Sequence, residues 1–331
     1  MDHDEGRTAA HELGCAREAW CDGDTPDVLT HLAVALSLAP LDGDALALLD
    51  EVLGAAGDGA LEALAVEDGT YFGLVALRAY VLAGRGRFDE ACGLLFDVAT
   101  FRPALPYLAW LERWRQRRFV AEPPDAAFAE AFAARVVSYA KAARAEAAGR
   151  GLAEGSRRNL EAALSALTWL AAGDPPRSRV AFATSFALRL LGRAAEASEV
   201  AGGWFAREPS WVSAVEAAAA CRASGDAEGA LRYYGEALSR RPDDVATRLD
   251  LGDVLLDERR FEEAARVYGE VLERAPHHPW AEPSFAFAEY GRTREARWRE
   301  ALRAMAEREP TRARASALEE RLANSPAFPP A

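Results

Sequence analysis

The stretch RRFEEAARVYGEVLERAPHHP, residues 259–279, decides the fold class. Apolar and aromatic side chains recur in it at helical spacing, and the glutamates and arginines fall mostly on the opposite face. The apolar face consists of Phe261, Ala264, Ala265, Tyr268, Val271 and Leu272. We therefore expect an amphipathic helix of about four turns, with one buried face, that ends at a proline.

Prolines recur at a nearly constant interval after the predicted helices in the second half of the chain. They are Pro175, Pro209, Pro242, Pro276 and Pro310, at spacings of 33 or 34 residues. Twelve residues before each of the first four prolines is an alanine, whose small side chain allows two helices to approach closely. A period near 34 residues predicts a repeated unit of two antiparallel helices.

The unit 245–278 resembles a tetratricopeptide repeat (TPR). Its Leu251-Gly252 pair, Ala264 and Tyr268 stand where the family pattern places a Leu-Gly pair, a small residue and an aromatic residue. Weaker copies lie at 72–105, 178–210, 211–244 and 279–312, and in a unit that ends at Pro40. The resemblance implies a bacterial-type TPR-containing protein with an all-α fold, a right-handed superhelical solenoid of antiparallel helix pairs.

The repeat pattern is interrupted between Pro103 and Pro175. Three helices are predicted there, at about 104–118, 125–148 and 156–172, whereas two regular units would need four. The expected domain organisation is an acidic TPR-like lobe at 1–120, an irregular helical connector at 121–176, a TPR array with a capping helix at 177–323, and a disordered tail at 324–331.

The resemblance also implies that the first helix of each unit lines a concave groove that binds a ligand. Carried over onto this sequence, the groove positions are Arg179, Phe182, Phe186, Arg189, Glu216, Arg222, Asp250, Asp253, Asp257, Trp280, Ser284 and Phe287. This set is aromatic at both ends and acidic in the unit 245–278, so the expected ligand is an apolar or basic peptide or helix. The alternative for each position is that the side chain packs against a neighbouring helix.

The carboxylate clamp of the family, which holds an acidic C-terminal tail through Lys, Asn and Arg, is not matched. Phe182 and Phe186 occupy two of its places in one unit. Glu216 and Asp250 occupy another place in the next two units, where they would repel a carboxylate. A co-chaperone of the clamp type is therefore not expected.

A second candidate surface is YLAWLERWRQRRF, residues 107–119, which interleaves aromatic and basic side chains. Its candidate residues are Trp110, Arg113, Trp114, Arg117 and Arg118. Such a pattern can bind nucleic acid or an acidic partner, but a buried aromatic stripe with a solvated arginine face explains the spacing as well. In a third interpretation, this helix lies against the acidic N-terminal lobe of the same chain or of a second copy.

The charge of the chain is unevenly distributed. Sixteen acidic and two basic residues give residues 1–70 a net charge of −14, so the rest of the chain carries +1 of the total of −13. The acidic N-terminal third argues against nucleic acid or an anionic membrane as a partner. We find no secretory signal, no apolar run of about 20 residues and no cysteine spacing typical of zinc. We expect a cytoplasmic protein without membrane insertion, metal or cofactor.

No phosphate loop, zinc-protease motif or nucleophile motif is present, so the chain is not expected to be an enzyme. The first hypothesis is a non-catalytic scaffold or adaptor that binds a protein or peptide in the repeat groove. The first alternative is a self-assembling homo-oligomer, in which the acidic lobe meets the arginine-rich helix 107–119 of another copy. The second alternative is a regulatory subunit or domain of an enzyme complex, with a site of its own in the irregular segment 104–172.

Overall fold

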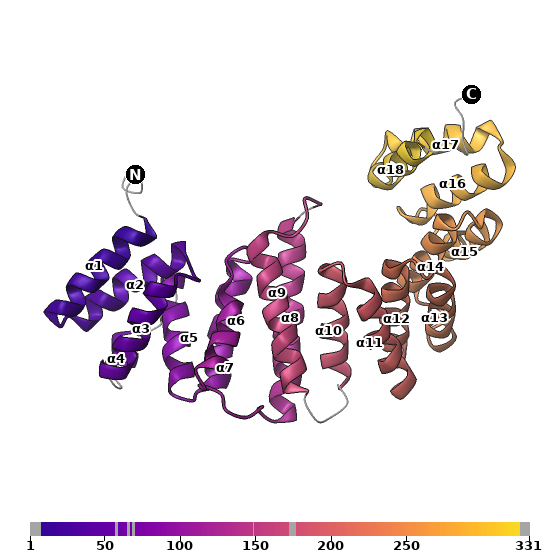
Figure 1. The fold of residues 1–331 in the computed structure, drawn as a ribbon. Helices are drawn as coiled ribbons and strands as arrows, with labels where there is room; N and C mark the ends of the chain where they lie inside the picture. Colours follow the sequence, from indigo (N-terminus) through magenta and orange to yellow (C-terminus); the bar gives the residue numbers. More distant parts are fainter. Residues whose placement is uncertain are drawn as a thin grey trace. The chain divides into compact units, whose positions relative to one another are not determined.

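The computed structural model of the chain is built from α-helices joined by short turns (Figure 1). It describes residues 8–56, 59–64, 67, 70–147, 149–171 and 177–324. No β-strand occurs among these residues, so the predicted all-α fold of helix pairs is confirmed. The predicted helix stop at Pro175 and the predicted tail beyond Asn324 lie outside the described residues.

The helices group into two compact units, Met1–Arg193 and Ala194–Ala331. In the first unit, α1 packs against α2, α5 packs against α6, and α8 lies against both α6 and α10. The helices of this unit are α1 (Ala9–Asp22), α2 (Thr25–Leu38), α3 (Gly43–Ala56), α4 (Gly59–Ala63), α5 (Phe72–Gly84), α6 (Phe88–Phe101), the 3-10 helix η1 (Tyr107–Ala109), α7 (Trp110–Gln116), α8 (Ala126–Ala147), α9 (Glu154–Leu170) and α10 (Ser178–Leu190). The finer division with boundaries at 120/121 and 176/177 stays a prediction.

The irregular middle segment has the three predicted helical stretches, and a buried asparagine holds their connection in place. The side-chain amide of Asn159 donates to the carbonyl oxygens of Pro103, at 3.3 Å, and Leu105, at 2.7 Å. Its carbonyl oxygen accepts from the backbone N–H of Leu108 at 2.8 Å. Asn159 is fully buried; it supplies the acceptor for the Leu108 N–H and adds a donor to the carbonyls of Pro103 and Leu105 in the non-repetitive backbone before α7.

The second unit is a run of helices in which each packs against the next, and α18 also contacts α16. Its helices are α11 (Ala194–Arg207), α12 (Trp211–Ser224), α13 (Ala227–Arg240), α14 (Val245–Asp257), α15 (Phe261–Arg274), α16 (Ala281–Thr293), α17 (Ala296–Ala306) and α18 (Arg312–Ala323). The capping helix predicted at the C-terminal end is α18, whose Ala315, Leu318 and Leu322 join the core of this unit.

The stretch that predicts the fold becomes α15, and its apolar face packs as expected. Tyr268 is fully buried, and its ring lies against Gly252 of α14. A Cβ at Gly252 would lie only 2.6 Å from Cζ of Tyr268, so the absence of a side chain there sets the spacing of α14 and α15. The alanines predicted to allow close approach, Ala163, Ala197, Ala230 and Ala264, are all fully buried.

Candidate partner-binding site

The residues predicted to line a groove belong to both units and are therefore described separately. The four residues on α10, which are Arg179, Phe182, Phe186 and Arg189, lie in the first unit. The rings of Phe182 and Phe186 stack at 6.0 Å, and the guanidinium of Arg189 lies 5.4 Å from the ring centre of Phe186. Arg179 is exposed, whereas Phe186 is buried.

Four of the predicted groove residues in the second unit are buried: Asp253, which is described below, and Glu216, Ser284 and Phe287. Only 4% of Glu216 and 1% of Phe287 is exposed, and Ser284 is fully buried. Phe287 is part of the apolar core that α14 to α18 share. For Glu216, Ser284 and Phe287 the packing alternative holds, because the helix face that carries them is turned toward neighbouring helices.

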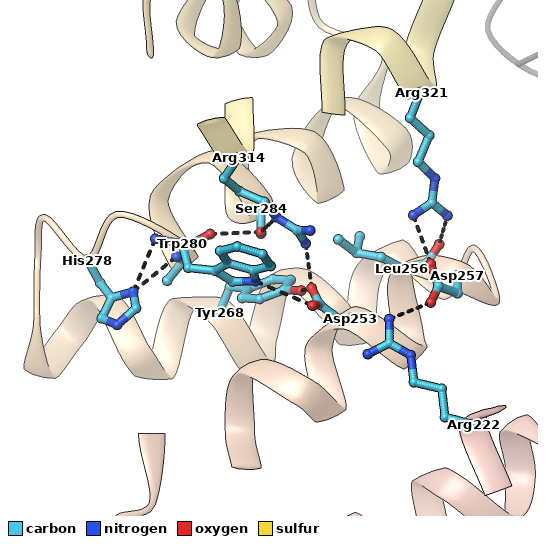
Figure 2. A network of polar contacts seen from close by, with 11 residues as sticks. Arg222, Asp253, Leu256, Asp257, Tyr268, His278, Trp280, Ser284, Arg314 and Arg321 are labelled. Atoms are coloured by element: carbon cyan, nitrogen blue, oxygen red, sulfur yellow. Dashed lines mark hydrogen bonds and ion pairs between the residues drawn. The ribbon is translucent and has the colours of Figure 1, made fainter. Parts of the chain in front are cut away.

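The remaining predicted residues of the second unit surround one face of α14. Asp250, Asp253 and Asp257 follow one another at helical spacing and therefore lie along the same side of the helix. Arg222 of α12 pairs with Asp257 at 2.9 Å, and the indole N–H of Trp280 donates to Asp253 at 3.3 Å (Figure 2). We call these five residues the α14 face. The structure thus brings this part of the predicted set together.

Asp253 is the most buried carboxylate of the α14 face, with 8% of the residue exposed. Its Oδ1 accepts a hydrogen bond from the hydroxyl of Tyr268 at 2.6 Å and a second from the guanidinium of Arg314. Burial raises the pKa of Tyr268, and the negative charge of Asp253 raises it further. The phenol therefore stays protonated and remains a donor to the carboxylate.

Arg314 comes from the C-terminal helix α18 and completes this cluster. Its guanidinium lies 4.2 Å from the ring centre of Trp280, and its Nε donates to the hydroxyl of Ser284 at 2.9 Å (Figure 2). The Arg314 side chain is 16% exposed, and the Asp253 side chain 11%. An ion pair this sheltered is strengthened by its low-dielectric surroundings, and the loss of one partner leaves the other charge without compensation.

A second arginine of α18 reaches the end of α14. Arg321 pairs with Asp257 at 2.9 Å and also donates to the backbone carbonyl of Leu256 at 2.8 Å. Asp257 thus lies between Arg321 and Arg222, each 2.9 Å from one of its oxygens (Figure 2). The side chains of all three are between 37% and 45% exposed, so each pair contributes only about 0–1 kcal/mol.

Asp250 differs from the two carboxylates beyond it on α14. It is half-buried, and no hydrogen bond or ion pair joins it to any residue that the structure describes. Burial raises the pKa of Asp250, and the neighbouring charge of Asp253 raises it further. A basic group of a ligand that approaches this carboxylate would stabilise its charged form and so favour binding.

The roles of Arg314 and Arg321 are not among those predicted from the sequence. Both lie on the predicted capping helix, seven residues apart, and therefore on one side of it. Their spacing beside the apolar residues of that helix was a usable signal. Which acidic residues they meet was not readable, because Arg314 and Asp253 are separated by 61 positions in the sequence.

The basic and aromatic segment 107–119 does not form the predicted surface patch. Trp110 and Trp114 are fully buried, so the prediction that they bind a partner is wrong. Arg113 pairs with Asp50 of α3 at 2.7 Å, and Arg117 pairs with the same carboxylate at 3.0 Å. The interpretation in which this helix lies against the acidic lobe of its own chain is therefore confirmed, and the two arginines are already engaged.

Metal sites and membrane-spanning helices are two further features that the sequence does not predict. Among the described residues, no group of three or more His, Cys, Asp or Glu side chains could hold a metal ion. Within the same residues, no helix combines the length and apolar character needed to cross a membrane. The cytoplasmic location, the bacterial origin and the exclusion of nucleic acid stay predictions.

Several solved structures resemble this chain, whereas no curated protein matches its sequence. A TPR protein of Thermus thermophilus is 16% identical, with 75% of this chain and 99% of that chain covered and a TM-score of 0.34. A TPR protein from Parabacteroides merdae ATCC 43184 is 14% identical, with coverage of 89% and 97% and a TM-score of 0.35. For the APC/C hetero-tetramer Cut9–Hcn1, the identity is 14%, the coverage 95% and 68%, and the TM-score 0.41.

One family model matches the sequence, and its description is tetratricopeptide repeat. The match covers residues 222–282, which include α13, α14 and α15 and therefore the best-preserved predicted repeat. The proline period and the paired helices on either side continue the same arrangement. Residues 222–282 of this chain thus match the tetratricopeptide-repeat family.

Proposed function

We propose that this protein is a non-catalytic scaffold or adaptor that binds a basic, partly apolar segment of a partner protein on the α14 face. The tetratricopeptide repeats support a role in protein–protein interaction. The character of the bound segment is inferred from the side chains of the α14 face. The alternative of self-assembly through Arg113 and Arg117 gains no support, because both arginines pair with Asp50 of the same chain.

The observation that carries the proposal is the carboxylate of Asp250, half-buried and unpaired among the described residues. The folded protein keeps this charge partly desolvated, at a cost that an arginine or lysine of a partner would offset. Because the fold already holds the Asp250 carboxylate in place, binding does not have to include the entropic cost of ordering this side chain.

The exposed indole of Trp280 supports an apolar component of the ligand. Trp280 is 41% exposed, although its N–H is engaged by Asp253 and its ring is in contact with Arg314. Tryptophan side chains that keep accessible area beside a charged group are frequent anchors of protein interfaces. The exposed Arg179 and half-buried Phe182 of α10 remain proposed partner contacts of the first unit.

The test begins with co-purification from the native cell and identification of bound proteins by mass spectrometry. Each purified partner is then titrated against the wild type and the double variant Asp250→Asn/Trp280→Ala. We expect the dissociation constant to rise about tenfold or more, because an anchor and a charge partner are lost together.

The matched control is Asp97→Asn/Phe101→Ala in the first unit, which removes an exposed aspartate and an aromatic ring that is 68% exposed. We expect this control to bind like the wild type. A partner that binds the Asp250→Asn/Trp280→Ala variant as tightly as the wild type would exclude the α14 face as its docking site.

A further inference from the structure

We infer that α18 is a built-in occupant of the α14 face, and that the partner which fits this face is a helix with the same chemistry as α18. That chemistry is a pair of arginines seven residues apart beside an apolar stripe. The partner helix competes with α18 for Asp253 and Asp257. This inference rests on the function proposed above, and it specifies the chemistry of the partner and the way in which α18 regulates its binding.

The contacts of α18 are those of a ligand as well as those of a cap. Its apolar side packs with Ala315, Leu318 and Leu322 into the core, and its packing neighbours are α16 and α17. Its two long basic side chains reach further, to carboxylates on α14. A cap needs only the apolar contacts and a polar outer surface. The arginines add the contacts that a basic helical ligand would make.

Few interactions stabilise α18 in its docked position. It has 12 residues, and its N-cap residue Thr311 makes no side-chain capping bond to the start of the helix. An isolated helix of this length is not stable in water, so α18 depends on its packing and on the arginine pairs. Elements with few buried contacts open at lower free energy than those in the core, and α18 contributes only Ala315, Leu318 and Leu322 to the core of this unit.

The docked α18 masks most of the charge that a basic partner would recognise. Arg314 pairs with Asp253 and covers part of Trp280, and Arg321 pairs with Asp257. Asp250 alone among the three carboxylates is left without a partner in the described chain. A ligand therefore meets a partly open face at first and gains the other two carboxylates only as α18 leaves. The apparent affinity of the ligand is therefore its intrinsic affinity multiplied by the fraction of molecules in which α18 is undocked.

The probe for the test is a fluorescent synthetic peptide with the sequence of residues 309–324, EPTRARASALEERLAN. It is titrated against the full-length wild type and against the full-length variant Arg314→Ser/Arg321→Ser. We expect the variant to bind the peptide about tenfold more tightly, because its own α18 no longer competes for the carboxylates. Addition of Asp253→Asn/Asp257→Asn to this variant should abolish the gain.

The matched control is Arg297→Ser/Arg312→Ser, which removes two exposed arginines of α17 and α18. Arg297 pairs with Glu295 and lies 5.0 Å from the ring centre of Trp298, and Arg312 pairs with Glu309 and donates to the backbone of residue 307, so these contacts lie outside the α14 face. This control should bind the peptide as weakly as the wild type does. Equal peptide affinities of the wild type and the Arg314→Ser/Arg321→Ser variant would overturn the inference, and so would absence of binding to that variant.

A second measurement needs no variant and so does not depend on how well one folds. Hydrogen exchange of the wild type is followed by mass spectrometry with and without saturating peptide. We expect faster exchange at the amides of residues 312–323, because the peptide takes the place of α18. Peptide binding that leaves the exchange of this helix unchanged would overturn the inference.

The outcomes for the partner protein separate the two proposals. A partner that needs Asp250 and Trp280 but binds the Arg314→Ser/Arg321→Ser variant no better than the wild type contradicts only the role of α18. A partner that binds independently of Asp250 and Trp280 contradicts the proposed function, whatever the peptide does to α18.

Discussion

Arg314 and Asp253 are 61 positions apart in the sequence and form an ion pair that joins the last helix to α14. Asp253 also accepts hydrogen bonds from Tyr268 and Trp280, so one carboxylate ties α14 to α15, α16 and α18. The C-terminal half of the second unit is therefore held together by a polar cluster as well as by its apolar core.

The first prediction concerns the strength of this pair. Arg314→Met should lower the free energy of unfolding by about 2–4 kcal/mol, because Asp253 is left with a sheltered and uncompensated charge. Arg321→Met should cost no more than about 1 kcal/mol, because its pair with Asp257 is more exposed. Urea unfolding of both variants measures the difference. Equal effects would show that the sheltered position of Asp253 has no energetic consequence.

The second prediction concerns the close contact of α14 and α15. Gly252→Ala should destabilise the protein by about 1–3 kcal/mol, because the new Cβ would overlap the Tyr268 ring and force the helices apart. Gly235→Ala on α13 is the control, since its Cβ would meet no atom within 4 Å. That control should stabilise the protein by about 0.5–1 kcal/mol through helix propensity. Thermal unfolding measures both, and a Gly252→Ala variant as stable as the wild type would refute the packing role.

The third prediction concerns Asn159 in the first unit. Asn159→Leu should cost about 2–4 kcal/mol, since it leaves the N–H of Leu108 unsatisfied and removes one of the hydrogen bonds to each of the Pro103 and Leu105 carbonyls. The exposed Gln116, which donates to Glu112 at 3.2 Å, provides the control, and Gln116→Ala should cost less than about 0.5 kcal/mol. Chemical unfolding of the two variants, monitored through the tryptophans, distinguishes these outcomes. Equal small losses would mean that the segment before α7 does not need Asn159.

The fourth prediction concerns alkaline pH. Burial raises the pKa of Tyr139 from 10.0 to about 12. Between these two values the unfolded chain loses the phenol proton and the folded protein keeps it, so stability falls as the pH rises. The slope for this group is about 1.4 kcal/mol per pH unit, and below pH 10 its contribution is constant.

The variant Tyr139→Phe removes this ionisation and tests the prediction. At pH 8 it should be about 1 kcal/mol less stable than the wild type, because it loses the hydrogen bond to the Pro103 carbonyl. Above pH 10 its disadvantage should shrink and then reverse. Urea midpoints at pH 8, 10 and 11.5 provide the comparison, and a gap that stays constant over this range would argue against the raised pKa.

The helices and their pairing were predictable because the repeat pattern depends on residues that lie close together in the sequence. The apolar face of α15, the buried alanine twelve residues before four of the five prolines and the close Gly252–Tyr268 contact all depend on spacing within one unit. The capping helix was predictable for the same reason, because its apolar side recurs at helical period.

The candidate site was predictable only in part. Transfer of groove positions by place in the repeat put Phe287 and Ser284 on the surface, but packing against neighbouring helices buries both. The same transfer grouped the three aspartates that lie on one side of α14, and their role as partner contacts stays a prediction. The meeting of Arg314 with Asp253 joins distant parts of the chain, and a hydrophobic period carries no information on such a pair.

The most direct test of the central claim is a display selection of random peptides, about 16 residues long, against the full-length wild type and against Asp250→Arg. The account predicts that the wild type selects peptides that combine arginine or lysine with apolar residues, and that Asp250→Arg shifts the selection toward acidic peptides. Selection of the same peptides by both proteins would contradict the claim that the α14 face recognises a basic segment.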